Sequence, residues 1–335
     1  MSRRARESTF VLLLLAWGSS GLSACGPGFD PASFIERPRL VGAEVRVEGA
    51  PGRATPLPGD DVTLEPWLLQ PEVPSPVRAS YVVCAATDVR RGAAGCRAMP
   101  LAFVPATPPS ESLPPVAFTV PPEAELAGAS QLLVLVASCD RGALPSLDAS
   151  TFLPTCDDPM ARAELTTLQI PLAFDAMLAN HHPTLLDEAF TVDAGPWSPR
   201  TESAPASCAL AEPDETLPRI VIPSDAAPPD AMEPFAVTLT FTTDEDDRET
   251  YGSAASPLRE SLQISHYVTH GQMERSFSAV DAMSDPSMPV AIDWIPPAFV
   301  DVPEAGAVVR FTWIARDLRG GFARADRALC LVRGS

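Results

Sequence analysis

The sequence contains no lysine, so all 24 of its basic residues are arginine. They are outnumbered by 43 acidic residues, which leaves a formal net charge of −19. Because nucleic acid is a polyanion, a chain of this charge is repelled by it, and we predict no nucleic-acid partner. The lack of lysine also excludes a catalytic Ser-x-x-Lys motif.

The sequence also lacks the short motifs typical of common catalytic and nucleotide-binding sites. Beyond residue 24 it has no Gly-x-Ser-x-Gly, no His-Glu-x-x-His and no glycine-rich phosphate-binding pattern. Carboxylates are too numerous to single out one pair for acid and base catalysis. We therefore predict that the protein is not an enzyme and that it uses no cofactor.

Long helical patterns are missing as well. The 335 residues include 38 prolines, roughly twice the usual share of about 5%. Beyond residue 24 no stretch sustains the apolar period of a helix, and only residues 159–163 and 173–180 could form a turn or two. The chain is therefore predicted to be all-β, and its length indicates about two domains.

The N-terminus has the three parts of a signal peptide. Arg3, Arg4 and Arg6 precede an apolar run over residues 10–17, and small residues follow. The run is too short to span a bilayer. We predict that residues 1–24 are a signal peptide that directs export.

Leu22-Ser23-Ala24-Cys25 resembles the lipobox of bacterial lipoproteins. This resemblance implies lipidation of Cys25 with palmitate-like acyl chains, which anchor the mature N-terminus firmly. Gly26 follows instead of the Asp that retains such proteins in the inner membrane, which implies the cell outer membrane. Residues 25–38 are predicted to be a lipidated tether. The alternative is ordinary cleavage after Ala24, which leaves Cys25 as an unpaired thiol.

Six further cysteines remain in the exported chain, and an even number in an oxidising compartment predicts disulfides. Chain order favours three pairs: Cys84 with Cys96, Cys139 with Cys156, and Cys208 with Cys330. A zinc site is the weaker alternative, because there is no Cys-x-x-Cys and only 4 histidines.

Short apolar-alternating runs, separated by proline-rich breaks, are predicted to be strands in both halves of the chain. The run 132–136 is apolar on both faces, which predicts a central strand covered on both sides. Pro171 belongs on a sheet edge. The other predicted strands are residues 41–48, 62–67, 79–85, 168–172, 235–242, 262–268, 290–295, 307–316 and 328–332.

Two pairs of segments repeat at a distance of about half the chain. Residues 38–48 align with 183–193, and both are predicted to be first strands. Residues 137–142 parallel 315–320, and each follows an apolar strand. The repeat predicts two domains, residues 39–178 and 179–335.

A strand that enters residues 244–247, followed by residues 264–271, 293–297 and 311–321, resembles the immunoglobulin-like or PKD-like modules of bacterial surface proteins. This resemblance implies two tandem immunoglobulin-like β-sandwich domains. The chain departs from antibody-type domains, because the expected second strand at 62–67 carries a Trp but no Cys. Antibody-type recognition is therefore not implied.

Three groups were considered as ligand sites, and we predict that none binds metal. His266 and His270 lie on a strand pattern, where positions i and i+4 are about 13 Å apart, too far for one ion. Asp244–Asp247 could supply calcium ligands but is predicted to be a solvated acidic turn. His181-His182 is predicted to mark the junction between domains. Trp294 and Trp313 are predicted to lie in the core, and Trp197 to pack over its own domain.

These observations predict a non-catalytic, lipid-anchored envelope protein that acts as a binding, adhesion or structural module. Its partners would be the membrane, through Cys25, and an envelope protein or polysaccharide on the periplasmic or surface face. The alternative is an accessory lipoprotein subunit of an envelope secretion or polysaccharide assembly machine.

Overall fold

The computed structural model describes residues 33–86, 95–97, 100–148, 153–185, 189–198, 208, 217–243, 248–253, 256–285 and 288–334. They belong to one compact unit, residues 32–335. Cys25 and Asp244–Asp247 lie outside the described residues. Within the described part, no helix is long and apolar enough to cross a membrane.

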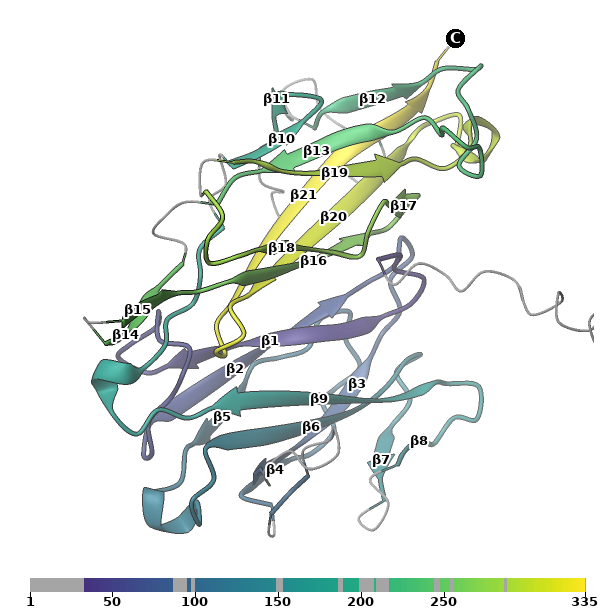
Figure 1. Ribbon diagram of the computed structural model, residues 1–335. Helices are drawn as coiled ribbons and strands as arrows, with labels where there is room; N and C mark the ends of the chain where they lie inside the picture. The colour runs from purple at the N-terminus through teal and green to yellow at the C-terminus, as the bar shows by residue number, and fades with distance from the viewer. Residues whose placement is uncertain are drawn as a thin grey trace, which may run out of the picture. The chain divides into compact units, whose positions relative to one another are not determined.

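The described chain is all-β, as predicted, and its strands form several sheets (Figure 1). The described helices are single 3₁₀ turns: η2 (Glu123–Glu125), η3 (Ala176–Leu178) and η5 (Phe299–Asp301). Of the two segments for which a helical turn was considered, residues 173–180 contain η3. Residues 159–163 do not form a helix, because a strand begins at Ala163.

The N-terminal half, defined here as strands β1 to β9, contains two larger sheets and a hairpin. One sheet has the order β1 (Arg39–Val47), β2 (Asp61–Leu69), β5 (Val116–Thr119). The other has the order β4 (Ala102–Val104), β3 (Arg78–Ala85), β6 (Gln131–Cys139), β9 (Ala163–Pro171), and the hairpin joins β7 (Pro145–Leu147) to β8 (Pro154–Cys156). Apolar side chains of both sheets meet in one core, the first core.

β6 is buried on both faces, as its uninterrupted apolar run predicted. Leu132 and Val134 point into the first core, whereas Leu133 and Leu135 pack on the opposite face with Cys84. This central position agrees with β6 lying between β3 and β9 in the sheet. β9 is the edge strand and ends at Pro171, which is where a residue without an N–H can be tolerated.

The C-terminal half, strands β10 to β21, contains two five-stranded sheets. One has the order β11 (Gly195–Pro196), β10 (Phe190–Val192), β13 (Val237–Phe241), β19 (Val290–Ile295), β17 (Gln272–Met273). The other has the order β12 (Arg219–Ile222), β21 (Phe322–Arg333), β20 (Ala307–Arg316), β16 (Leu262–Val268), β18 (Phe277–Val280). A hairpin joins β14 (Thr250–Ser253) to β15 (Ser256–Arg259). Both five-stranded sheets contribute to the second core.

Aromatic rings fill the second core. Trp294 and Trp313 are fully buried, as predicted, and Trp197 packs edge-on against both Phe311 and Trp313, with ring centroids 5.1 and 5.3 Å away. The indole N–H of Trp197 donates to the carbonyl of Ala328 at 2.8 Å, so its polar atom is satisfied. Trp197 therefore packs over its own half, in agreement with the prediction.

The two segments predicted to be equivalent first strands differ in the structure. Residues 39–47 form the nine-residue strand β1, whereas among the described residues of the second segment only Phe190–Val192 form a strand, β10, which pairs with β13. The prediction of a full-length strand at 183–193 is therefore wrong for residues 183–185 and 193. Tertiary pairing, rather than the local sequence pattern, sets the length of such a strand.

The end of the predicted tether is attached to the C-terminal half. Phe34 forms a parallel bridge with Val268 at the end of β16. The N–H of Ile35 donates to the Val268 carbonyl at 3.1 Å, and the N–H of Val268 donates to the Ser33 carbonyl at 2.9 Å. The chain thus touches the C-terminal half before it enters β1.

Candidate functional site

The three disulfides predicted from chain order are confirmed. Cys84–Cys96, Cys139–Cys156 and Cys208–Cys330 have Cα–Cα distances of 5.5, 5.9 and 5.5 Å. The first two lie in the N-terminal half and the third in the C-terminal half. Structural disulfides persist in oxidising compartments, so they indicate a location outside the cytoplasm.

His266 and His270, predicted to be ordinary strand or strand-end histidines, have separate hydrogen-bond partners. His266 lies in β16 and is buried, with Nδ1–H donating to the Arg275 carbonyl at 3.2 Å. His270 lies beyond the end of β16, and its Nε2 is 3.0 Å from Glu72. Within the described ranges, no group of three or more His, Cys, Asp or Glu side chains could hold a metal ion.

His181 and His182 lie where the chain passes from one half to the other, and they contact both halves. His182 Nε2–H donates to the Val45 carbonyl at 2.7 Å, and His182 Nδ1 accepts the N–H of Phe322 at 3.0 Å. This pairing requires the neutral imidazole with its proton on Nε2. A single side chain therefore joins β1 to β21.

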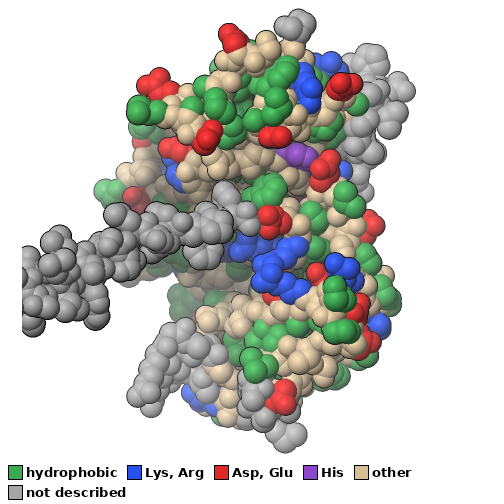
Figure 2. Space-filling model, turned by 90° about the vertical axis from the view of Figure 1, so that its right-hand side faces the viewer, with side chains coloured by type: hydrophobic (Ala, Val, Ile, Leu, Met, Phe, Trp, Pro, Cys, Tyr) green, Lys and Arg blue, Asp and Glu red, His purple; other side chains and the backbone are tan. Residues whose placement is uncertain are grey.

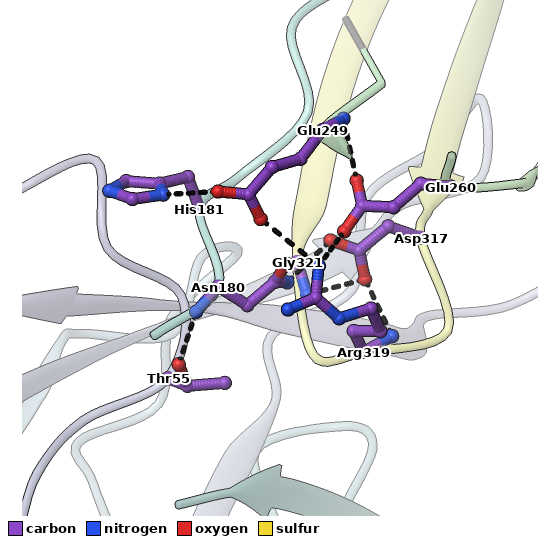
Figure 3. Close-up of polar contacts among 8 residues, drawn as sticks. All are labelled: Thr55, Asn180, His181, Glu249, Glu260, Asp317, Arg319 and Gly321. Atoms are coloured by element: carbon purple, nitrogen blue, oxygen red, sulfur yellow. Dashed lines mark hydrogen bonds and ion pairs between the residues drawn. The ribbon is translucent and has the colours of Figure 1, made fainter. Parts of the chain in front are cut away.

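The turn between β20 and β21 is the centre of a polar junction between the halves. Its first residue, Asp317, is buried and accepts the N–H groups of Arg319 and Gly321, each at 2.8 Å. The other carboxylate oxygen of Asp317 accepts Asn180 Nδ2–H at 2.6 Å, and the Asn180 N–H donates to Thr55 Oγ1 at 2.7 Å (Figure 3). Asp317 thus connects the β20–β21 turn to the N-terminal half.

Gly321 is required by this packing. A Cβ atom at residue 321 would collide with the Asp317 carboxylate and approach the His181 carbonyl to 2.7 Å. Both obstacles belong to fixed parts of the junction. A side chain at residue 321 would therefore force the β20–β21 turn away from His181, in the segment that connects the two halves (the linker). The glycine therefore permits the close approach that Asp317 needs to reach Asn180.

The second part of the junction is an ion network around Arg319. Arg319 Nη1 donates to Glu260 Oε1 at 2.6 Å and to Glu249 Oε2 at 3.0 Å, and its guanidinium lies 4.2 Å from the ring of Tyr251. Glu249 also meets His181 Nδ1 at 2.9 Å (Figure 3). The network extends from the β20–β21 turn through Glu249 to the linker.

Glu260 is the buried acid of this network. Burial raises the pKa of Glu260 to about 7, the nearby Asp317 charge adds to the shift, and the Glu249 N–H and Arg319 oppose it. Perturbed carboxyl groups of this kind occur in active sites but also in structural ion networks. Here both oxygens are engaged, by Arg319 and by the Glu249 N–H at 3.1 Å. The arrangement is suited to holding elements together rather than to transferring protons.

A third set of contacts places apolar and aromatic groups beside the polar ones. Phe322, the first residue of β21, lies with its ring 6.1 Å from that of Trp67 on β2, in an edge arrangement. Arg316 lies over the same ring at 5.6 Å and donates to the Val41 carbonyl at 2.8 Å. The β20–β21 hairpin is therefore fastened to the N-terminal half by packing as well as by hydrogen bonds.

Only part of this site can be predicted from the sequence. His181-His182 is predicted at the junction, whereas residues 315–320 are indicated only as a segment that follows an apolar strand. Glu249 and Glu260 were not singled out, because two glutamates among 43 acidic residues carry no signal of their own. The available signal was Gly320-Gly321 next to Asp317 and Arg319, since paired glycines mark a position where backbone approaches closely.

Replacing Asp317 by Ala is expected to lower the free energy of unfolding by about 1–3 kcal/mol, because it leaves buried N–H donors of Asn180, Arg319 and Gly321 without their acceptor. Chemical denaturation at constant pH measures this loss. Asp301→Ala, at an exposed aspartate, is the control and should change the midpoint little. Equal effects of the two substitutions would contradict the role of Asp317.

Comparison with known proteins adds little to this description. No family model and no curated protein matches the chain. Among solved structures it is similar to the crystal structure of red sea bream transglutaminase, at 13% identity and a TM-score of 0.21. The match covers 88% of this chain but 32% of that one, so the chain spans about a third of its length. A likeness this weak carries no argument about fold or activity.

Proposed function

We propose that this chain is a lipid-anchored protein of the bacterial cell envelope, built from two tandem immunoglobulin-like domains, that acts without catalysis as a binding, adhesion or structural module. The observation that carries the proposal is the position of Leu22-Ser23-Ala24-Cys25, which follows a basic start, a short apolar run and four small residues. Such a sequence resembles a lipoprotein signal in both composition and place.

Two structural features support this proposal. The three disulfides fit a chain that works after export. The titratable groups at the junction are engaged in holding the halves together, as expected of a module whose purpose is to present surfaces in a fixed arrangement. Two sheets around each of two cores also fit tandem sandwich domains.

Cys25→Ala tests the anchor. Without the thiol there is no attachment point for acyl chains, so labelled fatty acid should no longer enter the protein and it should leave the membrane fraction. Gly26→Asp is the matched control: it should keep the lipid and move the protein from the outer to the inner membrane. A Cys25→Ala protein that stays in the membrane would overturn the proposed anchor.

Crosslinking in intact cells, followed by purification, tests the role. Recovery of other surface or envelope components would support a binding module. Recovery with integral subunits of one secretion or polysaccharide assembly complex would instead support the accessory-subunit alternative.

A further inference from the structure

Arg310 differs from every other described arginine that is buried or half-buried. The others have a hydrogen bond, an ion pair, a ring contact or a further interaction of their own: Arg39, Arg53, Arg78, Arg248, Arg259, Arg316, Arg319, Arg324, Arg327 and Arg333. The Arg310 guanidinium contacts no acid or acceptor in the described part, and its Nε is shielded from solvent without a partner.

An arginine Nε–H that is shielded from solvent and has no acceptor is unfavourable in the free protein. Taking a charged group out of water costs free energy that only an opposite charge or hydrogen-bond acceptors can return. The sequence has 43 acidic residues, and Glu111 lines the same hollow as Arg310, yet no described acid forms an ion pair with Arg310. The missing acceptor is therefore one that the described part of the protein does not supply.

Arg310 lines a hollow of about 400 Å³ that can receive such an acceptor. Arg324 lines the same hollow, and its ion pair with Asp326 at 2.8 Å leaves Nη1 without a partner. Ile35, Leu68 and Leu69 form an apolar part of the wall. Figure 2, which views the right-hand side of Figure 1, shows arginine side chains gathered near the middle of that face.

We propose that this hollow binds the phosphate group of a phosphate ester, with Arg310 as its principal ligand. A guanidinium matches phosphate oxygens well, and phosphate offers a further oxygen to Arg324 where a carboxylate has only two. The hollow is much larger than one phosphate group, so the apolar wall can hold the organic part of the ester.

The ester can come from a lipid headgroup or from solution. Ile35 is ten residues from Cys25, which spans at most about 35 Å when fully extended. If Cys25 carries the lipid anchor, as proposed above, the hollow is held within reach of the membrane surface. The lipid source alone rests on that proposal; phosphate binding by Arg310 does not.

The first experiment measures binding of glycerol 3-phosphate by calorimetry to the full chain carrying Cys25→Ala. We expect saturable binding that Arg310→Gln weakens about tenfold or more, because a charge-assisted contact is lost. Arg219→Gln, at an exposed arginine that does not line the hollow, should leave the affinity unchanged. The melting temperature of Arg310→Gln should be equal to or above that of the parent, since an unpaired cation is removed.

The second experiment separates the two sources by sedimentation with vesicles of phosphatidylglycerol or of phosphatidylcholine. Binding to phosphatidylglycerol that depends on Arg310 indicates the lipid source, and binding of glycerol 3-phosphate alone indicates a soluble ester. Absence of binding to either, or equal binding by Arg310→Gln and its parent, overturns the site. Membrane retention of the lipidated protein is a separate measurement, so failure of the site and failure of the anchor remain distinguishable.

Discussion

Replacing Cys208 by Ala is expected to destabilise the C-terminal half by about 2–5 kcal/mol, the usual cost of losing a native disulfide. The bond to Cys330 joins residues 122 apart and fixes Cys208 to β21. A loop of this length belongs to the upper part of that range in the chain-entropy account. Thermal unfolding under oxidising conditions measures the effect.

The location of this disulfide makes the result specific. Cys208 and Cys330 form a small cluster with Val308 and Ala328 that is separate from the second core, so the substitution leaves the packing of that core intact. Amides of β21 should lose protection from hydrogen exchange while those of β6 keep theirs. In Cys208→Ala, Cys330 should react with maleimide once the protein is denatured.

In Cys208→Ala the thiol of Cys330 is left unpaired, and the Cys208→Ala, Cys330→Ala double variant controls for effects of that free thiol. The stability of the double variant should match that of the single variant. Peptide mapping of the parent protein provides the decisive check. A peptide joining Cys208 or Cys330 to a cysteine of the N-terminal half would contradict both the pairing and the idea that each half closes its own disulfides.

The limits of three strands of the C-terminal half could be predicted from sequence, but those of the longest, β21, could not: it spans Phe322–Arg333, whereas only residues 328–332 were predicted. β16, β19 and β20 coincide with the predicted residues 262–268, 290–295 and 307–316. β16 and β19 alternate because one face of each packs into the second core, whereas β20 is apolar over most of its length and is buried on both faces. Short strands such as β4 and β17 have three and two residues and were missed, because distant partners rather than local pattern define them.

The junction was less accessible to sequence reasoning, for a physical reason. Asn180 and Asp317 are 137 positions apart, and nothing in either local sequence indicates the other. Histidine next to proline at 181–183 suggested a boundary, but the contacts of His182 with Val45 and Phe322 depend on how the halves meet. Local pattern predicts elements, whereas a network of this kind arises only once they are assembled.

The stability of the protein is expected to depend on pH through two buried groups with opposite effects. Burial lowers the pKa of His266 from 6.5 to about 4. Between these values the unfolded chain binds more protons than the folded one, so stability falls as the pH drops from 6.5 to 4. The full contribution is about 3 kcal/mol, since one pKa unit corresponds to 1.36 kcal/mol.

Glu260 acts in the other direction. Its pKa is raised from 4.5 to about 7, so the folded state binds the extra proton in this window. Its contribution is complete below pH 4.5 and is lost as the pH rises through 7, again by about 3 kcal/mol. Between pH 4.5 and 6.5 the contributions of His266 and Glu260 to the pH dependence of stability have opposite signs and largely cancel. The stability of the parent protein therefore shows neither contribution in this range.

Removing one group at a time should expose the other. In His266→Gln, stability should fall with rising pH from 4.5 to 7, because Glu260 acts without opposition. In Glu260→Gln, stability should rise from pH 4 to 6.5, because only the buried imidazole remains. Urea denaturation at half-unit pH steps gives both slopes, and the difference between the variants cancels the titration of the exposed carboxylates that they share. Parallel pH profiles for the two variants would show that neither buried group titrates as its surroundings require.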